Sequence, residues 1–163
     1  EAPASASQYL KRQERKMMSE KQHEKKILLI EDNPADARLI FEAIKFESTI
    51  AQDSILTLGD GASAIEYLAQ SENTNDKPLL IILDLNLPIV DGREVLVYIK
   101  QNDSLKHIPV LVLSSSISVQ DLRFSYENHA NCFIRKPVSF DEFSAVVSSI
   151  ENFWLKTVTL PDH

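Results

Sequence analysis

Four apolar segments of the chain are each followed directly by residues that can do chemistry. These residues are three carboxylates, a hydroxyl and an ammonium, namely Glu31, Asp32, Asp84, Ser114 and Lys136. If the apolar segments are strands of one parallel sheet, their carboxyl ends meet at one edge, which is where ligands bind in such sheets. We therefore expect these five side chains to lie together.

The three carboxylates limit what such a cluster can be. Like charges a few ångströms apart repel one another, so either some are protonated or a cation neutralises them. Mg²⁺ prefers oxygen ligands, keeps several waters and takes one or two carboxylates together with a substrate phosphate. We expect Asp32 and Asp84 to be direct ligands, Glu31 to act through water, and the backbone carbonyl of Asn86 to complete the site.

Lys136 and the Ser114 hydroxyl would then face the anion that sits on the metal. A carboxylate, Mg²⁺, a lysine and a hydroxyl suit phosphoryl transfer, which depends on positioning and charge neutralisation. Aspartate is an established phosphoryl acceptor, so Asp84 is the predicted nucleophile.

The elements that must position these residues follow a regular pattern. Apolar runs predict strands at 27–30, within 50–58, at 79–83, at 109–113 and at 132–134. Capping residues and helical spacing predict helices that begin near Asn33, Asp60 and Asp91, a fourth over 118–129, and a last one from the Ser139–Glu142 capping box to about Trp154. Strict alternation of strands and helices indicates an α/β fold, a doubly wound parallel sheet with helices on both faces.

Composition and charge narrow the class of protein. The chain has 163 residues and a formal net charge of −7, and its single cysteine, Cys132, excludes a disulfide framework or a cysteine metal site. Residues 1–26 hold seven basic and four acidic residues, whereas residues 27–163 hold ten and twenty. An acidic body argues against direct nucleic-acid binding. With no apolar run long enough for a membrane span, we expect a cytoplasmic protein.

The first 25 residues differ in composition from the rest. We expect 1–25 to be an N-terminal extension or linker, in part foreign to the natural protein, 26–155 to be the folded domain, and 156–163 to be a C-terminal tail. Phe153 and Trp154 can either close the core or form a dimer surface.

Four segments resemble the receiver domain of two-component response regulators, namely IEDN at 30–33, ILDLNLPIVDG at 82–92, VLS at 112–114 and RKP at 135–137. The resemblance runs from residue 26 to about residue 150. Two finer features, EDNPAD at 31–36 and the FWL and VTLP segments within 153–161, resemble the small stand-alone cyanobacterial regulators that work with phytochrome-type histidine kinases.

The resemblance implies a flavodoxin-like sheet with strand order 2-1-3-4-5. It also implies that Asp84 accepts a phosphoryl group from a sensor histidine kinase, and that Asp32, the Asn86 carbonyl and Glu31 hold Mg²⁺. Lys136 would pair with the phosphoryl oxygens, and a cis bond to Pro137 would help to present it.

Further roles follow from the same resemblance. Ser114 would hydrogen-bond the phosphoryl group, and Phe133 would be the aromatic switch whose rotamer follows. Ser115 would limit access to the site, while Asn86 and Ser116 would tune hydrolysis. Phosphorylation would act by adding charge that reorganises a bistable surface.

The resemblance implies a signalling switch rather than an enzyme, and an output through protein contacts. We expect a homodimer that uses the fourth helix, the fifth strand and the last helix, with no DNA-binding domain after Lys136. One alternative is a magnesium-dependent phosphatase, but such enzymes favour a second aspartate where this chain has Asn86. Another is a receiver that binds partners without phosphate, which would have lost Asp84 or Lys136.

Overall fold

The sheet of the protein has five parallel strands. A computed structural model describes residues 27–47, 54–74, 76–116 and 118–161, so the predicted extension at 1–25 lies outside the described residues. The strands are β1 (Ile27–Ile30), β2 (Ile55–Leu58), β3 (Leu80–Leu83), β4 (Val110–Ser114) and β5 (Cys132–Arg135). Their order is β2-β1-β3-β4-β5, with every neighbouring pair parallel, which confirms the predicted topology.

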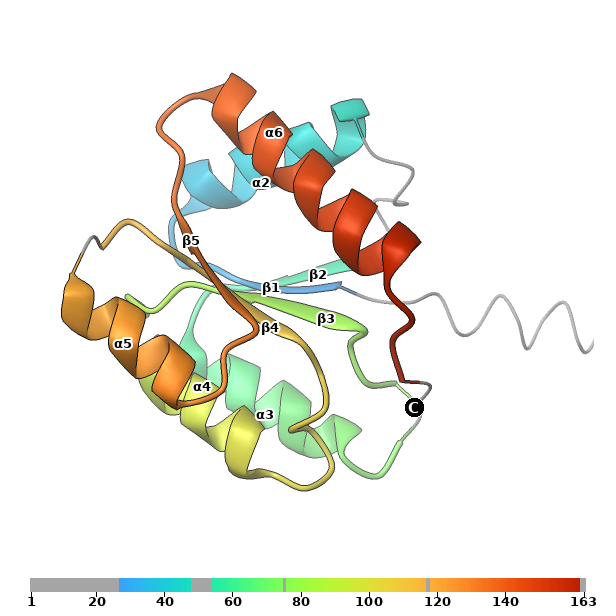
Figure 1. Cartoon of the computed structure of the whole chain (residues 1–163). Helices are drawn as coiled ribbons and strands as arrows, with labels where there is room; N and C mark the ends of the chain where they lie inside the picture. The colour runs from blue at the N-terminus through green and yellow to red at the C-terminus, as the bar shows by residue number, and fades with distance from the viewer. Residues whose placement is uncertain (1–26, 48–53, 75, 117, 162–163) are drawn as a thin grey trace, which may run out of the picture.

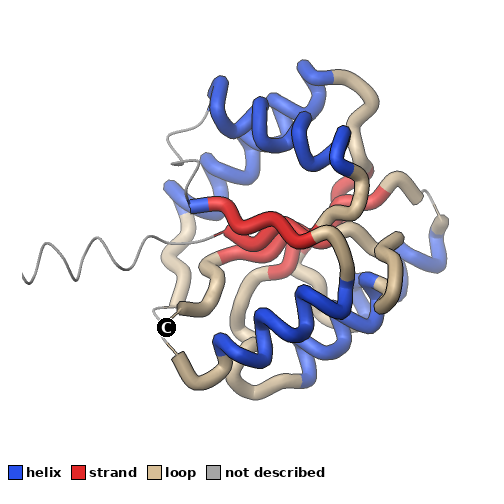
Figure 2. The backbone as a smooth tube through the Cα atoms, turned by 180° about the vertical axis from the view of Figure 1, so that it is seen from behind, coloured by secondary structure: helices blue, strands red, loops and turns tan. Residues whose placement is uncertain are grey.

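Helices cover both faces of this sheet. They are α2 (Pro34–Glu47), α3 (Gly61–Ser71), α4 (Gly92–Gln101), α5 (Val119–Glu127) and α6 (Phe140–Ile150). In Figure 1, α2 and α6 lie above the sheet and α3, α4 and α5 lie below it. The view from behind in Figure 2 shows the same two helical layers with the strands between them. None of the helices within the described ranges is long and apolar enough to cross a membrane.

The two layers divide the core in two because side chains alternate across each strand. Leu28 and Ile30 of β1 pack toward α3, α4 and α5, whereas Ile27 and Leu29 pack toward α2 and α6. All four are buried. A continuous apolar run is what a strand covered on both faces requires.

The last helical segment extends slightly beyond its predicted end near Trp154. After α6 the chain continues as a π-helix, η2 (Glu151–Thr157), so helical structure passes Trp154. The side chains of Phe153 and Trp154 form an edge-to-face pair with ring centroids 5.3 Å apart. Trp154 packs against the core toward α2 and α6, while Phe153 is exposed. Trp154 therefore helps to close the core, whereas a dimer surface at Phe153 stays a prediction.

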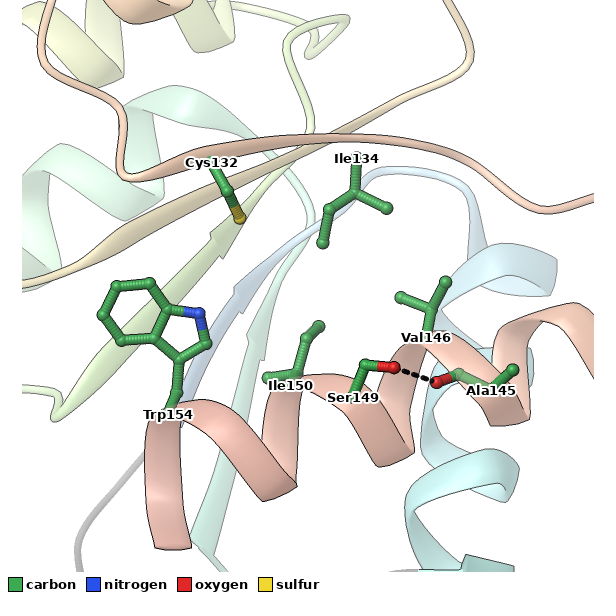
Figure 3. Close-up of a pocket in the computed structure, with 7 residues that line it drawn as sticks. All are labelled: Cys132, Ile134, Ala145, Val146, Ser149, Ile150 and Trp154. Carbon is green, nitrogen blue, oxygen red and sulfur yellow. Dashed lines mark hydrogen bonds between the residues drawn. The ribbon is translucent and has the colours of Figure 1, made fainter. Parts of the chain in front are cut away.

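Trp154 also closes an apolar pocket between β5 and the last helix (Figure 3). The pocket is lined by Cys132, Ile134, Ala145, Val146, Ser149, Ile150 and Trp154. Burial there raises the pKa of the Cys132 thiol to about 11. The thiol is thus protonated at neutral pH and serves as a small apolar group in the pocket wall.

Side-chain caps fix where the helices begin. Asn33 Oδ1 accepts the backbone N–H of Ala35 at 2.9 Å at the start of α2. Ser139 Oγ accepts the N–H of Glu142 at 3.3 Å, which is one half of the predicted capping box. The Glu142 carboxylate instead accepts the N–H of Val138 at 3.1 Å, so it caps one residue earlier than predicted.

Two glycines hold the loop between β3 and α4 in place. A Cβ on Gly92 would lie 2.0 Å from the carbonyl oxygen of Asp84, and one on Gly61 would lie 2.1 Å from that of Val90. Within this loop Ile89 has a φ of 69°, which a β-branched residue rarely adopts. The close packing of Gly92 fixes the backbone of Asp84, so the Asp91-Gly92 pair does more than cap α4.

Candidate functional site

The carboxyl ends of the strands meet at one edge, as the sequence predicts. Ile30 pairs in register with Leu83, and the N–H of Asp84 donates to the carbonyl of Ile30 at 2.9 Å. At the other side of the sheet, the N–H of Lys136 donates to the carbonyl of Ser114 at 2.8 Å. Backbone pairing alone therefore delivers Asp84, Ser114 and Lys136 to the same edge.

Lys136 is the centre of the site. Its Nζ lies 2.6 Å from Asp84 Oδ2, 2.7 Å from Glu31 Oε2 and 3.0 Å from Asp36 Oδ2. The Lys136 side chain is 7% exposed, and those of Asp84 and Glu31 are 4% and 1% exposed. One buried ammonium is thus shared among three carboxylates.

Burial and charge act on these groups in opposite directions. Burial raises the pKa of Glu31, and this outweighs the lowering by the Lys136 ammonium and the Asn33 N–H. Burial would lower the pKa of Lys136, but hydrogen bonds to Asp84, Glu31 and Asp36 raise it above its ordinary value. The ammonium therefore stays charged, while burial favours the protonated form of Glu31.

The donor set fits a hard divalent cation. Glu31, Asp32 and Asp84 each offer a carboxylate oxygen, and these oxygens lie within 4.8 Å of one another. Asp32 is exposed, whereas the other two are buried, so an ion could keep water on the open side. The Asn86 N–H donates to Asp84 Oδ1 at 3.0 Å, which places Asn86 beside the cluster. Its carbonyl as a metal ligand stays a prediction.

The three serines after β4 differ in their surroundings. Ser114 is fully buried, and its Oγ accepts the N–H of Ser116 at 3.2 Å. Ser115 is exposed, and Ser116 Oγ accepts the N–H of Ser118 at 3.1 Å. Ser114 is therefore the hydroxyl that the fold holds at the sheet edge, but the roles of all three serines stay predictions.

Phe133 lies in β5. It is half-buried and packs against the part of the core that α3, α4 and α5 cover, and its N–H donates to the Tyr126 hydroxyl at 3.2 Å. Its role as a switch stays a prediction.

The prediction of a cis bond between Lys136 and Pro137 is wrong, since that bond is trans. Lys136 reaches the carboxylates in the trans form, because the β5 register already directs it to the edge.

Sequence reasoning missed Asp36 as a site residue, although Asp36 ends the EDNPAD segment at 31–36. The structure places its carboxylate on Lys136, a hundred positions further along the chain. The available signal was its position in the first turn of the helix that follows Glu31 and Asp32, because that turn starts at the same sheet edge.

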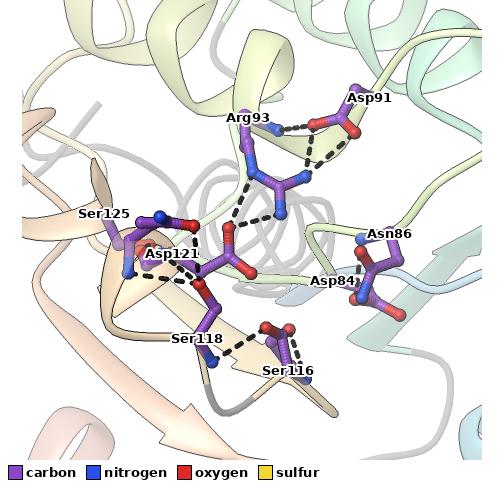
Figure 4. A network of polar contacts seen from close by, with 10 residues as sticks. Asp84, Asn86, Asp91, Arg93, Ser116, Ser118, Asp121 and Ser125 are labelled. Atoms are coloured by element: carbon purple, nitrogen blue, oxygen red, sulfur yellow. Dashed lines mark hydrogen bonds and ion pairs between the residues drawn. The ribbon is translucent and has the colours of Figure 1, made fainter. Parts of the chain in front are cut away.

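A second polar cluster, also missed, joins α4 to α5 (Figure 4). Arg93 donates through Nε to Asp121 Oδ1 at 3.0 Å and through Nη1 to both oxygens of Asp91 at 3.0 Å. Hydrogen bonds from Ser116 and Arg93 lower the pKa of Asp121. Asp121 therefore connects α5 both to α4 and to the loop that carries the serines.

Comparisons with known proteins agree with this geometry. Residues 27–148 match the family model described as the response regulator receiver domain. The chain is 49% identical to the response regulator Rcp1 of Synechocystis sp. over 148 residues, covering 89% of this chain and 99% of Rcp1. It is 45% identical over 130 residues to the probable methanogenesis regulatory protein FilR2 of Methanothrix harundinacea, covering 79% of this chain and 83% of FilR2.

Solved structures similar to this chain are also response regulators. A structure of the phosphorylated cyanobacterial phytochrome response regulator RcpA superimposes with a TM-score of 0.77 at 49% identity, covering 84% of this chain and 98% of that one. The Mn²⁺-bound form of Rcp1 gives 0.76 at 49% identity, covering 84% and 99%. The chain therefore belongs to the family of response regulator receiver domains, which are signalling switches, and it is related to phytochrome response regulators.

Proposed function

We propose that this protein accepts a phosphoryl group on Asp84 and signals through a changed protein surface. The observation that carries the proposal is the buried Lys136 ammonium, which lies 2.6 Å from Asp84 Oδ2 in a cluster with more carboxylates than cations. Such a site combines an acceptor carboxylate with fixed positive charge, which is what phosphoryl transfer requires.

In the proposed step an Asp84 oxygen attacks the phosphorus of a phosphohistidine. The new P–O bond forms as the P–N bond breaks, and the released histidine nitrogen keeps the electron pair and takes up a proton. Lys136 turns from the Asp84 carboxylate to a phosphoryl oxygen, and the Ser114 hydroxyl donates a hydrogen bond to another. Asp32, Asp84, Glu31 and the Asn86 carbonyl would hold Mg²⁺, which would supply charge neutralisation.

Asn86 supports a switch rather than a phosphatase. The side-chain amide at this position cannot act as a general acid or base. The backbone N–H of Asn86 donates to Asp84 Oδ1, so it supports the acceptor carboxylate. With Ser115 and Ser116, it would instead set how fast water reaches the acyl phosphate.

The proposed donor is a sensor histidine kinase of the phytochrome type. The support is the likeness to Rcp1 and to RcpA, which is named a phytochrome response regulator. A cytoplasmic location is part of the proposal, and the single cysteine fits a reducing compartment.

The proposed output is a phosphorylation-dependent homodimer. Val119, Leu122 and Tyr126 are exposed apolar residues spaced along one face of α5, and Phe153 is exposed on η2. Apolar side chains grouped on a helix face favour contact with another protein. Gel filtration with and without phosphodonor, for the wild type and Leu122→Glu, tests this part. An elution volume that never changes with phosphorylation would contradict it.

The central experiment is intact mass spectrometry after incubation with Mg²⁺ and acetyl phosphate. We expect one added phosphoryl group on the wild type, none on Asp84→Asn, and none on the wild type when EDTA is present. Asp103→Asn is the matched control, because Asp103 is an exposed aspartate away from the site and should still allow labelling. A wild type that gains no mass, or an Asp84→Asn variant that does, would overturn the proposal.

A further inference from the structure

Lys136 has three N–H donors, and all three have a carboxylate within ion-pair distance. Two of these carboxylates, Glu31 and Asp84, also belong to the group whose oxygens converge within 4.8 Å. Asp36 does not belong to that group. It is thus the one partner of Lys136 that neither a metal ion nor a phosphoryl group would claim.

The fold holds Asp36 in place independently of the metal group. Its backbone N–H donates to Asn33 Oδ1 at 3.4 Å, within the cap that begins α2. A carboxylate in the first turn is stabilised by the partial positive charge of the helix N-terminus. Asp36 is 26% exposed at its side chain, so its charge costs less desolvation than those of the buried Glu31 and Asp84.

The three contacts on Lys136 cannot all persist during phosphoryl transfer. A metal ion would draw Glu31 and Asp84 toward itself, and Asp84 would become an acyl phosphate. The ammonium would then lose two of its anchors at the moment when it must face the phosphoryl oxygens. The Asp36 contact at 3.0 Å remains and limits where Nζ can go.

We propose that Asp36 is a positioning residue for phosphoryl transfer, which holds the Lys136 ammonium over Asp84 while the other carboxylates change partners. The inference rests on the proposed function of Asp84 and adds a residue to its machinery. Loss of a group that orients a reacting side chain costs about 10–100-fold in activity in comparable metal sites. We expect the lower end, because the backbone of Lys136 stays in place at the end of β5 through its hydrogen bond to the Ser114 carbonyl.

The test is the rate of phosphorylation by acetyl phosphate at saturating Mg²⁺, followed by intact mass. We expect Asp36→Ala to be slower than the wild type by about tenfold. Asp36→Asn keeps an acceptor oxygen for the ammonium and should recover part of the rate. The Mg²⁺ concentration that gives half the maximal rate should change much less than the rate itself, since Asp36 is outside the metal group.

A matched control separates positioning from helix stability. Asp141 is also an acid in the first turn of a helix, but it is exposed and belongs to α6. Asp141→Ala should therefore phosphorylate at the wild-type rate, and circular dichroism should show all variants folded at the assay temperature.

The outcomes are distinguishable. A wild type that gains no phosphoryl group overturns the proposed function, and this inference falls with it. A phosphorylated wild type with Asp36→Ala at the same rate overturns the inference alone. So does an Asp36→Asn variant as slow as Asp36→Ala, or a loss of Mg²⁺ affinity as large as the loss of rate.

Discussion

Lys136 and Arg93 are both cations held by carboxylates from separate elements, yet their surroundings differ. The Lys136 side chain is 7% exposed and lies among Glu31, Asp36 and Asp84. The Arg93 side chain is 30% exposed and binds Asp91 and Asp121, whose side chains are 42% and 12% exposed. Water can screen the charges of the Arg93 cluster, but it hardly reaches Lys136, Glu31 and Asp84.

The difference in exposure distinguishes a candidate functional site, the Lys136 cluster, from a structural contact between helices, the Arg93 cluster. Buried carboxylates that outnumber their cation are costly, and a bound cation or a change of protonation relieves that cost. The Lys136 cluster is in this position, with Asp32 as a further acid at its open side. At Arg93 two carboxylates also outnumber one guanidinium, but water screens the excess charge, so that cluster connects α4 to α5 at little electrostatic cost.

The largest effect is expected at Lys136. Lys136→Met keeps much of the side-chain volume but leaves Glu31 and Asp84 buried without their cation. Removing one partner of a buried pair costs about 3–5 kcal/mol, and we expect about 3 kcal/mol in urea unfolding at pH 7.5 without metal. Phosphorylation by acetyl phosphate should also be strongly slowed. A variant as stable as the wild type would show that the cluster is not electrostatically coupled.

The stability lost in Lys136→Met should depend on pH through Glu31. The pKa of Lys136 is raised above the ordinary lysine value of 10.5, so Lys136 itself stays charged from pH 5 to 8 and its own titration adds no pH dependence there. Glu31 has a raised pKa and can become protonated on acidification. The cost of Lys136→Met should therefore be smaller at pH 5 than at pH 7.5.

Metal binding should distinguish the clusters next. At a hundredfold excess over its dissociation constant, Mg²⁺ stabilises a folded protein by about 2.7 kcal/mol. We expect the wild type and Asp121→Asn to gain stability with Mg²⁺, and Asp32→Asn to gain much less. The reason is that Asp32 contributes one of the convergent carboxylate oxygens, whereas Asp121 does not. Thermal unfolding with MgCl₂ and with EDTA measures this. Equal gains for both variants would remove Asp32 from the site.

A smaller effect of opposite sign is expected at Glu31. Its pKa is raised above 4.5, so the folded protein binds the proton more tightly than the unfolded chain. Its contribution to stability is therefore present below pH 4.5 and declines as the pH rises through the folded-state pKa. Glu31→Gln removes that decline, and we expect it to be more stable than the wild type by about 1 kcal/mol at pH 7.5 in EDTA.

The control for Glu31→Gln is the same comparison near pH 4, where the advantage should shrink because the wild-type carboxyl is protonated as well. A variant that is less stable than the wild type at pH 7.5 would mean that the contact with Lys136 outweighs burial.

The smallest effect is expected at Arg93. Partly exposed ion pairs contribute about 0–1 kcal/mol, so Arg93→Ala should lower the unfolding free energy by no more than about 1 kcal/mol. Arg93→Lys should recover part of this, since it keeps the charge but not the two-pronged contact with Asp91 and Asp121. The phosphorylation rate of both Arg93 variants should stay far above that of Lys136→Met. A rate as low as that variant's would make the second cluster part of the site.

The sequence alone determined the elements and most of the site. Apolar runs, caps such as Asn33, and the alternation of strands and helices are local signals, and they predicted the parallel sheet. Its strand order followed from the resemblance to receiver domains. Residues directly after strands must meet at one edge of a parallel sheet, so Glu31, Asp84 and Lys136 could be grouped without coordinates.

Only the tertiary structure decided which side chains touch. The contact of Asp36 with Lys136 spans a hundred positions, and that of Arg93 with Asp121 spans 28. Both depend on how helices pack on the sheet, which no local pattern encodes. The structure alone also showed the Glu142 bond to Val138, the trans bond before Pro137 and the π-helical end at Thr157. Periodicity determines which face of an element is apolar, whereas distances between side chains follow from the whole fold.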